Sequence, residues 1–152
     1  MAGTRFATNF AHLEEHDEQL ARLGMLAEKH FAEDPNTSLQ KVCQFCELLA
    51  QLAAATVGQY SSQDDRHYDL LRRLQDHGIV PPEIGRLFHE VRRIGNSANH
   101  GIRSDHGSSL SAIKLGWQIS VWFHRTFGQP AFKSGAFSRL LKFSPADKLR
   151  RT

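Results

Sequence analysis

Apolar residues recur every three or four positions through most of this 152-residue chain, which is the spacing of one face of an α-helix. No segment shows the apolar–polar alternation of a half-buried strand, and the β-branched residues are scattered along the chain. A chain of this length can bury a core without disulfides or metal ions. The sequence therefore predicts an all-α domain, a bundle of about five helices.

The expected helices are separated by residues that start or stop helices. Proline is disfavoured inside a helix but suits its first turn, so Pro35 and Pro82 are expected to open the second and fourth helices. Gly58 and Gly78 fit the position just beyond the end of the second and third. A short helical or turn segment is expected at 9–16. Five helices are expected after it, at 17–31, 35–57, between 65 and 78, from 82 through 103, and from about 110 to 127. A turn at 105–109 is expected to separate the last two helices.

The fifth expected helix is apolar on most sides, so we expect it at the centre of the bundle or in a subunit interface. Residues 1–128 would then form the helical domain, and residues 129–152 an irregular basic tail. Residues 133–152 carry six basic residues and one acidic residue, whereas residues 1–132 carry 13 basic and 15 acidic residues. Such a tail could contact nucleic acid or serve as a solvated connection.

Several classes of function have no support in the sequence. The GxxxxGK[ST], GxGxxG and GxSxG patterns are absent, which argues against ATP hydrolysis, dinucleotide binding and α/β-hydrolase chemistry. No apolar run approaches the roughly 18 to 20 residues that span a bilayer. The first nine residues also lack the apolar stretch of a signal peptide. The expectation is a cytoplasmic protein that does not contact a membrane.

Two patterns could bind a metal ion, and for both a simpler interpretation is favoured. Cys43 and Cys46 lie one helical turn apart within an apolar pattern, where they fit small core residues better than a redox pair or half of a zinc site. His12, Glu15 and His16 match the H-x-x-E-H pattern, and on a helix the two histidines would lie one turn apart. No third ligand for this pattern can be identified from the sequence. We therefore predict no metal and no other cofactor.

A line of polar side chains follows one face of the fourth expected helix. Arg93, Asn96, His100 and Arg103 occupy positions i, i+3, i+7 and i+10, which share one stripe of an α-helix. The opposite face is apolar. Guanidinium groups bind phosphate through two parallel hydrogen bonds, and an imidazole can transfer a proton near neutral pH. The stripe is thus a candidate phosphate or RNA site, although an ordinary solvated helix face or an internal hydrogen-bond network would show the same spacing.

The same stretch belongs to a series of motifs through which the chain resembles a known family. It resembles the domain of unknown function at the N-terminus of many type I restriction endonuclease R subunits, which is grouped with the HEPN superfamily (higher eukaryotes and prokaryotes nucleotide-binding). The similarity extends over most of the chain. The motifs that carry it are Asn9-Phe10, Ala27-Glu28 before Asp34-Pro35, Cys46-Glu47, Gly78-Ile79-Val80-Pro81, Arg92 to His100, Trp122 to Gly128 and Phe132 to Phe137.

The resemblance implies a HEPN-like helical bundle and a role in restriction–modification, the defence against phage and other foreign DNA. The nuclease and ATP-driven translocase of R subunits do not fit in 152 residues. We therefore expect a domain that is not an enzyme by itself and that acts in assembly or in contact with DNA or RNA. Arg92, Arg93 and Arg103 are the expected nucleic-acid-binding residues. The expected partners are nucleic acid, other restriction–modification subunits and a second copy of the chain.

The resemblance also leaves a catalytic alternative open. HEPN ribonucleases generally carry Arg-x(4–6)-His, often with a polar residue directly after the arginine. Here Asn96 and His100 match that pattern, but Gly95 stands where the arginine usually does, and the nearest arginine on the stripe is Arg93. The alternative is a toxin-like, metal-independent endoribonuclease that acts as a dimer, with His100 as acid/base, Arg93 as phosphate clamp and Asn96 as orienting group. Because a glycine inside a helix costs roughly 0.5 to 1 kcal/mol relative to alanine, Gly95 points to a close helix contact, in packing or in dimerisation, more than to chemistry.

Overall fold

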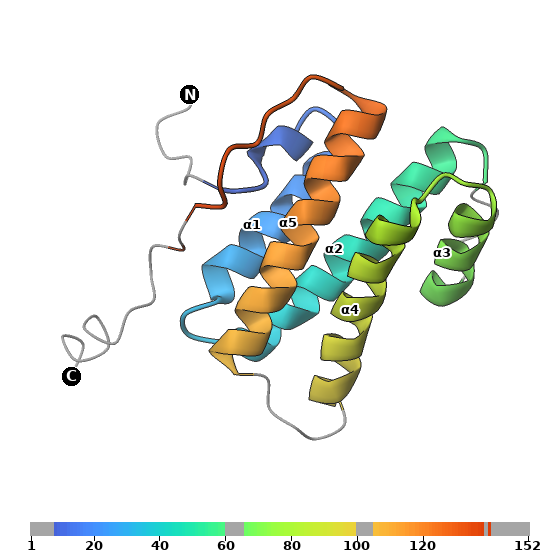
Figure 1. Cartoon of the computed structure of the whole chain (residues 1–152). Coiled ribbons are helices and arrows are strands. Elements are labelled where there is room, and N and C mark those ends of the chain that lie inside the picture. Colours follow the sequence, from blue (N-terminus) through green and yellow to red (C-terminus); the bar gives the residue numbers. More distant parts are fainter. Residues whose placement is uncertain (1–7, 60–65, 100–104, 139, 141–152) are drawn as a thin grey trace, which may run out of the picture.

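A computed structural model of the chain describes residues 8–59, 66–99, 105–138 and 140 (Figure 1). Within these ranges the chain forms five α-helices and one short 3-10 helix, and no strand. The all-α prediction is confirmed. The helices are η1 (Ala11–Leu13), α1 (Glu18–His30), α2 (Pro35–Thr56), α3 (His67–Asp76), α4 (Pro82–Asn99) and α5 (His106–Phe127).

The ends of the first helices follow the capping residues that the sequence offers. The Asp17 carboxylate accepts the Leu20 N–H at 2.9 Å at the start of α1, and Asp34 does the same for Thr37 at 3.1 Å at the start of α2. Gly58, just beyond α2, has a φ of 72°, in the left-handed region that glycine adopts without steric strain.

The expected turn at 105–109 is wrong, because α5 already begins at His106. The Asp105 carboxylate accepts the Ser108 N–H at 2.6 Å and so caps the helix one turn earlier than expected. Glycine and serine in this first turn are typical of a loop, but an aspartate cap lets a helix begin ahead of them.

Helix α2 packs against all four of the other α-helices, so the central place expected for α5 is shared with α2. Helix α5 lies beside α2. It packs against α1, α2 and α4 and contacts η1, while α3 lies at the far side against α2 and α4 (Figure 1). Phe10, Phe45 and Phe88 are among the largest fully buried side chains, and the rings of Phe10 and Phe45 meet edge to face at 5.1 Å. No helix in the described part of the chain combines the length and the apolarity needed to cross a bilayer.

Gly95 lies where α4 packs against α2. A Cβ atom at this position would come within 2.7 Å of the Cys43 Sγ, so the close helix contact expected for this glycine is present inside the chain. Burial raises the pKa of the Cys43 thiol to about 11, and it raises that of the fully buried Cys46 well above its usual range. Both cysteines are free thiols of the core. This confirms their interpretation as small packing residues.

After α5 the chain turns back and runs along the bundle toward η1 (Figure 1). The Asn9 side chain accepts the Ser138 N–H at 2.7 Å and donates to the Ser138 carbonyl at 3.1 Å. The Phe137 ring packs edge to face on Trp117, with ring centres 5.5 Å apart. The first part of the expected tail therefore packs against the body. The boundary between a domain at 1–128 and a tail at 129–152 stays a prediction, and residues 141–152 lie outside the described residues.

Candidate functional site

Among the described residues, Arg92 is the expected nucleic-acid-binding residue that is most available to a ligand. It is exposed on α4, and its guanidinium lies over the ring of Tyr68 from α3, 4.7 Å from the ring centre. Tyr68 itself is 42% exposed. No carboxylate in the described part of the chain forms an ion pair with Arg92. A solvent-facing cation thus lies against an aromatic face that is also open to solvent.

Arg93, its neighbour in sequence, is in a different situation. The Glu90 carboxylate, one turn earlier on α4, accepts hydrogen bonds from the Arg93 Nε at 3.2 and 3.1 Å and a closer one from Nη2. This ion pair raises the pKa of Arg93 and lowers that of Glu90. Both side chains are exposed, so the pair contributes little stability, but it offsets the charge that a phosphate would need.

Of the remaining residues of the predicted site, the structure describes only Asn96. Asn96 is exposed on α4, one turn beyond Arg92 and Arg93. His100 and Arg103 lie outside the described residues. The catalytic assignment to His100, Arg93 and Asn96 therefore stays a prediction.

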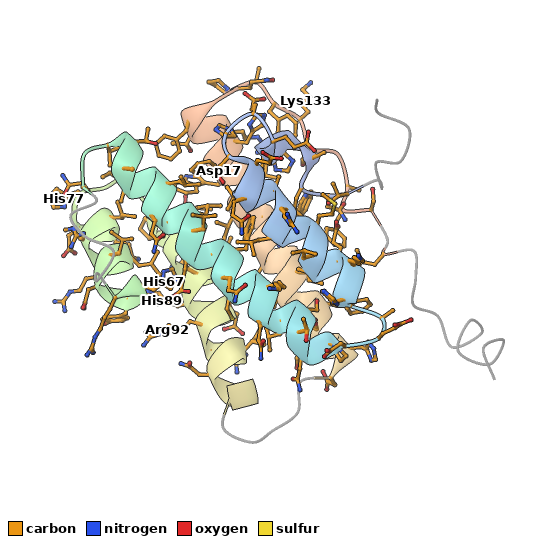
Figure 2. All side chains as sticks on the ribbon, turned by 180° about the vertical axis from the view of Figure 1, so that it is seen from behind. Asp17, His67, His77, His89, Arg92 and Lys133 are labelled. Atoms are coloured by element: carbon orange, nitrogen blue, oxygen red, sulfur yellow. The ribbon has the colours of Figure 1, made fainter. Side chains whose placement is uncertain are left out.

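Two histidines that the sequence analysis did not single out lie beside Arg92. Figure 2 shows His67 at the start of α3 and His89 on α4 close to the Arg92 side chain. His89 is exposed, and its ring centre is 6.2 Å from that of Tyr68. We call the surface formed by His67, Tyr68, His89 and Arg92 the α3–α4 face. The sequence signal was present, since His89 and Arg92 are spaced i, i+3, but pairing them with α3 required the tertiary structure.

His67 is the least accessible member of this face. Burial, followed by the nearby Arg92 and His89, lowers the pKa of His67 from 6.5 to about 4. Its ring packs edge to face on Phe88 at 6.0 Å, and its Nδ1 is buried without a hydrogen-bond partner among the described residues. His67 is therefore neutral at physiological pH, and the positive charge of the face comes from Arg92.

A second group of histidines lies at the other end of the bundle. The Nε2 of His16, from the segment before α1, lies 2.8 Å from the Nδ1 of His124 in the last turn of α5. The Nε2 of His12 lies 2.9 Å from the Ser120 hydroxyl. The Glu15 carboxylate lies 3.9 Å from the Nε2 of His124. We call Glu15, His12, His16 and His124 the histidine cluster. The sequence analysis noted its first three members but missed His124, because more than 100 positions separate it from them.

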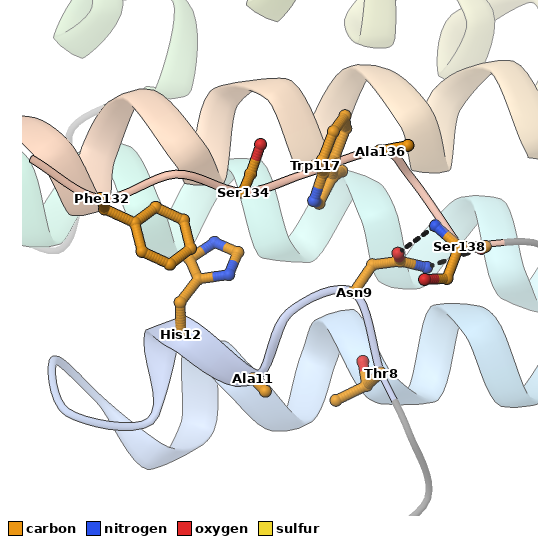
Figure 3. A pocket seen from close by; sticks show the side chains of 9 residues that line it. All are labelled: Thr8, Asn9, Ala11, His12, Trp117, Phe132, Ser134, Ala136 and Ser138. Carbon is orange, nitrogen blue, oxygen red and sulfur yellow. Dashed lines mark hydrogen bonds between the residues drawn. The ribbon is translucent and has the colours of Figure 1, made fainter.

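The histidine cluster borders a half-open cavity of about 410 Å³ between η1, α5 and the returning segment (Figure 3). The rings of His12 and Phe132 face each other on one side of it, with centres 5.0 Å apart. The imidazole of His12 is largely buried, and burial together with His124 and His16 lowers its pKa to about 4. The cavity is lined by Thr8, Asn9, Ala11, His12, Trp117, Phe132, Ser134, Ala136 and Ser138.

The chain is similar to a component of a restriction enzyme. It is 30% identical over 118 residues to the type I restriction enzyme EcoKI endonuclease subunit of Escherichia coli (strain K12). It is a distant homologue of that subunit. The match covers 78% of this chain but 10% of the subunit, so the chain spans about a tenth of the length of its relative. No protein-family model matches the chain, and no solved structure matches it significantly. The restriction part of the resemblance is thus confirmed, while the HEPN assignment stays a prediction.

Proposed function

We propose that this chain is a non-catalytic accessory domain of a type I restriction endonuclease subunit and that it contacts nucleic acid through the α3–α4 face. The 30% identity to such a subunit over most of the chain is the observation that carries the proposal. The ATP-driven translocase and the nuclease of R subunits do not fit in 152 residues. The contribution of this chain to restriction would therefore be binding.

The chemistry of the α3–α4 face fits a nucleic acid. Arginine binds phosphate through a planar fork of donors and also stacks on rings, and an exposed tyrosine offers a face on which a base can stack. Arg92 and Tyr68 provide both groups side by side. Among the predicted binding residues, Arg92 has no carboxylate partner in the described ranges, whereas Arg93 is paired with Glu90. Arg92 is therefore the main phosphate contact in this proposal.

The ribonuclease alternative has weaker support from the described residues. An arginine at position 95, where the HEPN pattern usually has it, does not fit, because even a Cβ there would meet the Cys43 Sγ at 2.7 Å. The remaining candidate, Arg93, is engaged by Glu90. Incubation of the chain with RNA in EDTA tests the alternative. If the chain cleaves RNA in EDTA and the His100→Ala variant does not, the chain is a metal-independent ribonuclease and the accessory function is refuted.

The binding proposal is tested with a matched pair of arginine variants. Fluorescence anisotropy would measure binding of the chain to double-stranded DNA and to single-stranded RNA at several salt concentrations. We expect Arg92→Ala to weaken binding about fivefold. The slope of the logarithm of the binding constant against the logarithm of the salt concentration should fall in magnitude by about one, as the loss of one phosphate contact implies. Arg93→Ala removes the same charge from the adjacent position and should change affinity less than twofold. An equal or larger effect of Arg93→Ala, or no binding at 50 mM salt, contradicts the proposal.

A role in restriction implies protein partners as well, namely modification and specificity subunits and a second copy of the chain. Co-purification with these subunits and the measured mass in solution test those contacts separately from nucleic-acid binding. The genes beside this reading frame offer a further check. Neighbouring methylase and specificity genes would support restriction, whereas a small nucleotidyltransferase-like partner gene would support the ribonuclease.

A further inference from the structure

The histidine cluster brings together, from two distant parts of the chain, three side chains of the types that serve as metal ligands. Glu15 and His16 precede α1, and His124 lies in the last turn of α5. One ligand atom from each of these three residues can be chosen so that all three lie within 4.8 Å of one another. Two imidazole nitrogens, His16 Nε2 and His124 Nδ1, face each other at 2.8 Å.

We propose that Glu15, His16 and His124 bind a divalent transition-metal ion of the Zn²⁺ class. Imidazole and carboxylate are common zinc ligands, with bonds of about 2.0 to 2.2 Å, so donors on a tetrahedral ion lie roughly 3.3 Å apart. The two imidazole nitrogens would therefore separate by about 0.5 Å around an ion, and Glu15 would approach. Side-chain rotations of this size leave the backbone in place.

The surroundings of the three ligands restrict their movement. His124 is 1% exposed, and its ring meets Phe132 edge to face at 4.5 Å. A Cβ at Gly128 would lie 2.8 Å from the Cε1 of His16, so this glycine lets the chain pack directly against the imidazole. The side-chain amide of Gln129 donates a hydrogen bond to Glu15 Oε1 at 3.1 Å. This bond orients the Glu15 carboxylate, as hydrogen-bond partners of metal ligands commonly do.

Glu15 is the open side of the cluster, because its side chain is 48% exposed. An ion can enter from this side, and a fourth position can be filled by water. His12 is not part of the ligand set, since its Nε2 is occupied by Ser120. The ion would join the segment before α1 to the end of α5, where the returning segment also packs. This site is on other elements than the α3–α4 face and does not depend on the nucleic-acid proposal.

The test uses the untagged 152-residue chain, freed of metal with a chelator, because a histidine tag would bind the same ions. Isothermal titration with Zn²⁺ should show one site of micromolar or tighter affinity, and Zn²⁺ at about 100 times the Kd should raise the Tm by roughly 5 to 10 °C. Co²⁺ should give the visible absorption of a tetrahedral complex. His16→Gln and Glu15→Gln should each weaken Zn²⁺ binding at least ~10-fold.

His77→Gln is the matched control, because His77 is an exposed histidine of the segment after α3 and should leave Zn²⁺ affinity unchanged. Circular dichroism of each metal-free variant checks that it folds. The absence of Zn²⁺ binding below 1 mM would overturn the proposal. So would Zn²⁺ affinity that is the same in His16→Gln as in the unaltered chain, or that falls as much in His77→Gln.

Discussion

The histidine cluster and the α3–α4 face both contain histidines but differ in where their polar atoms point. In the histidine cluster the imidazoles of His16 and His124 meet each other, and Phe132 closes over them. On the α3–α4 face the guanidinium of Arg92 lies over an exposed ring and faces solvent. Composition therefore does not distinguish a cluster closed within the bundle from an exposed polar surface. What distinguishes them is whether the polar groups already meet partners within the chain.

The largest difference between the two regions should appear in stability. His124→Ala removes a buried ring and leaves the His16 nitrogen without its partner, so we expect a loss of about 2 to 4 kcal/mol in the free energy of unfolding. Arg92→Ala changes an exposed side chain and should alter it by at most about 0.5 kcal/mol. Urea denaturation in EDTA measures both. Similar changes in the free energy of unfolding for the two substitutions would show that the histidine cluster is no more tightly packed than the α3–α4 face.

A smaller effect is expected from pH at the α3–α4 face. The folded state holds the pKa of His67 at about 4, against 6.5 in the unfolded chain, because of burial and the nearby Arg92 and His89. As the pH falls below 6.5 the unfolded state binds a proton that the folded state resists, so stability is lost until about pH 4, where both states are protonated. Between pH 7 and pH 5 this single group should account for about 2 kcal/mol.

Urea denaturation at pH 7, 6 and 5 measures this contribution as the difference between the unaltered chain and His67→Gln. The variant should lose stability less steeply as the pH falls. His77→Gln, which removes an exposed imidazole, should retain the slope of the unaltered chain. A His67→Gln curve parallel to that of the unaltered chain would mean that His67 titrates normally and that the face is more open than described.

The smallest of these effects concerns the helix that carries Arg92. Gly95→Ala gains about 1 kcal/mol of helix propensity but places a methyl group 2.7 Å from the Cys43 Sγ, and overpacking costs about 1 to 3 kcal/mol. The net result should be a destabilisation of about 1 kcal/mol. In a Cys43→Ala background the clash is absent, so Gly95→Ala should there become neutral or stabilising. A double-mutant cycle by thermal unfolding measures the coupling, and additive effects would refute the packing role of Gly95.

Most of the fold could be predicted from the sequence because its determinants are local. Helical spacing of apolar residues, an aspartate or proline at a helix start and a glycine beyond its end act within one or two turns. The start of α5 was misplaced because Gly107 and Ser108 resemble a loop, although Asp105 caps the helix ahead of them.

The candidate sites were less predictable, since their members come from different helices. The stripe on α4 can be predicted from its spacing. Nothing in the sequence shows that Glu90 forms an ion pair with Arg93, or that the guanidinium of Arg92 lies over the Tyr68 ring. The H-x-x-E-H pattern was visible, yet the third side chain, His124, is contributed by a helix at the other end of the chain.

The amino-acid order thus determined the helices and their boundaries within a few residues, because each depends on neighbouring positions. Only the packing of five helices decided which polar side chains meet. Contacts between Tyr68 and Arg92, or between His16 and His124, form when distant segments are brought together to bury a shared apolar core, and the pairing of their polar edges follows from that burial.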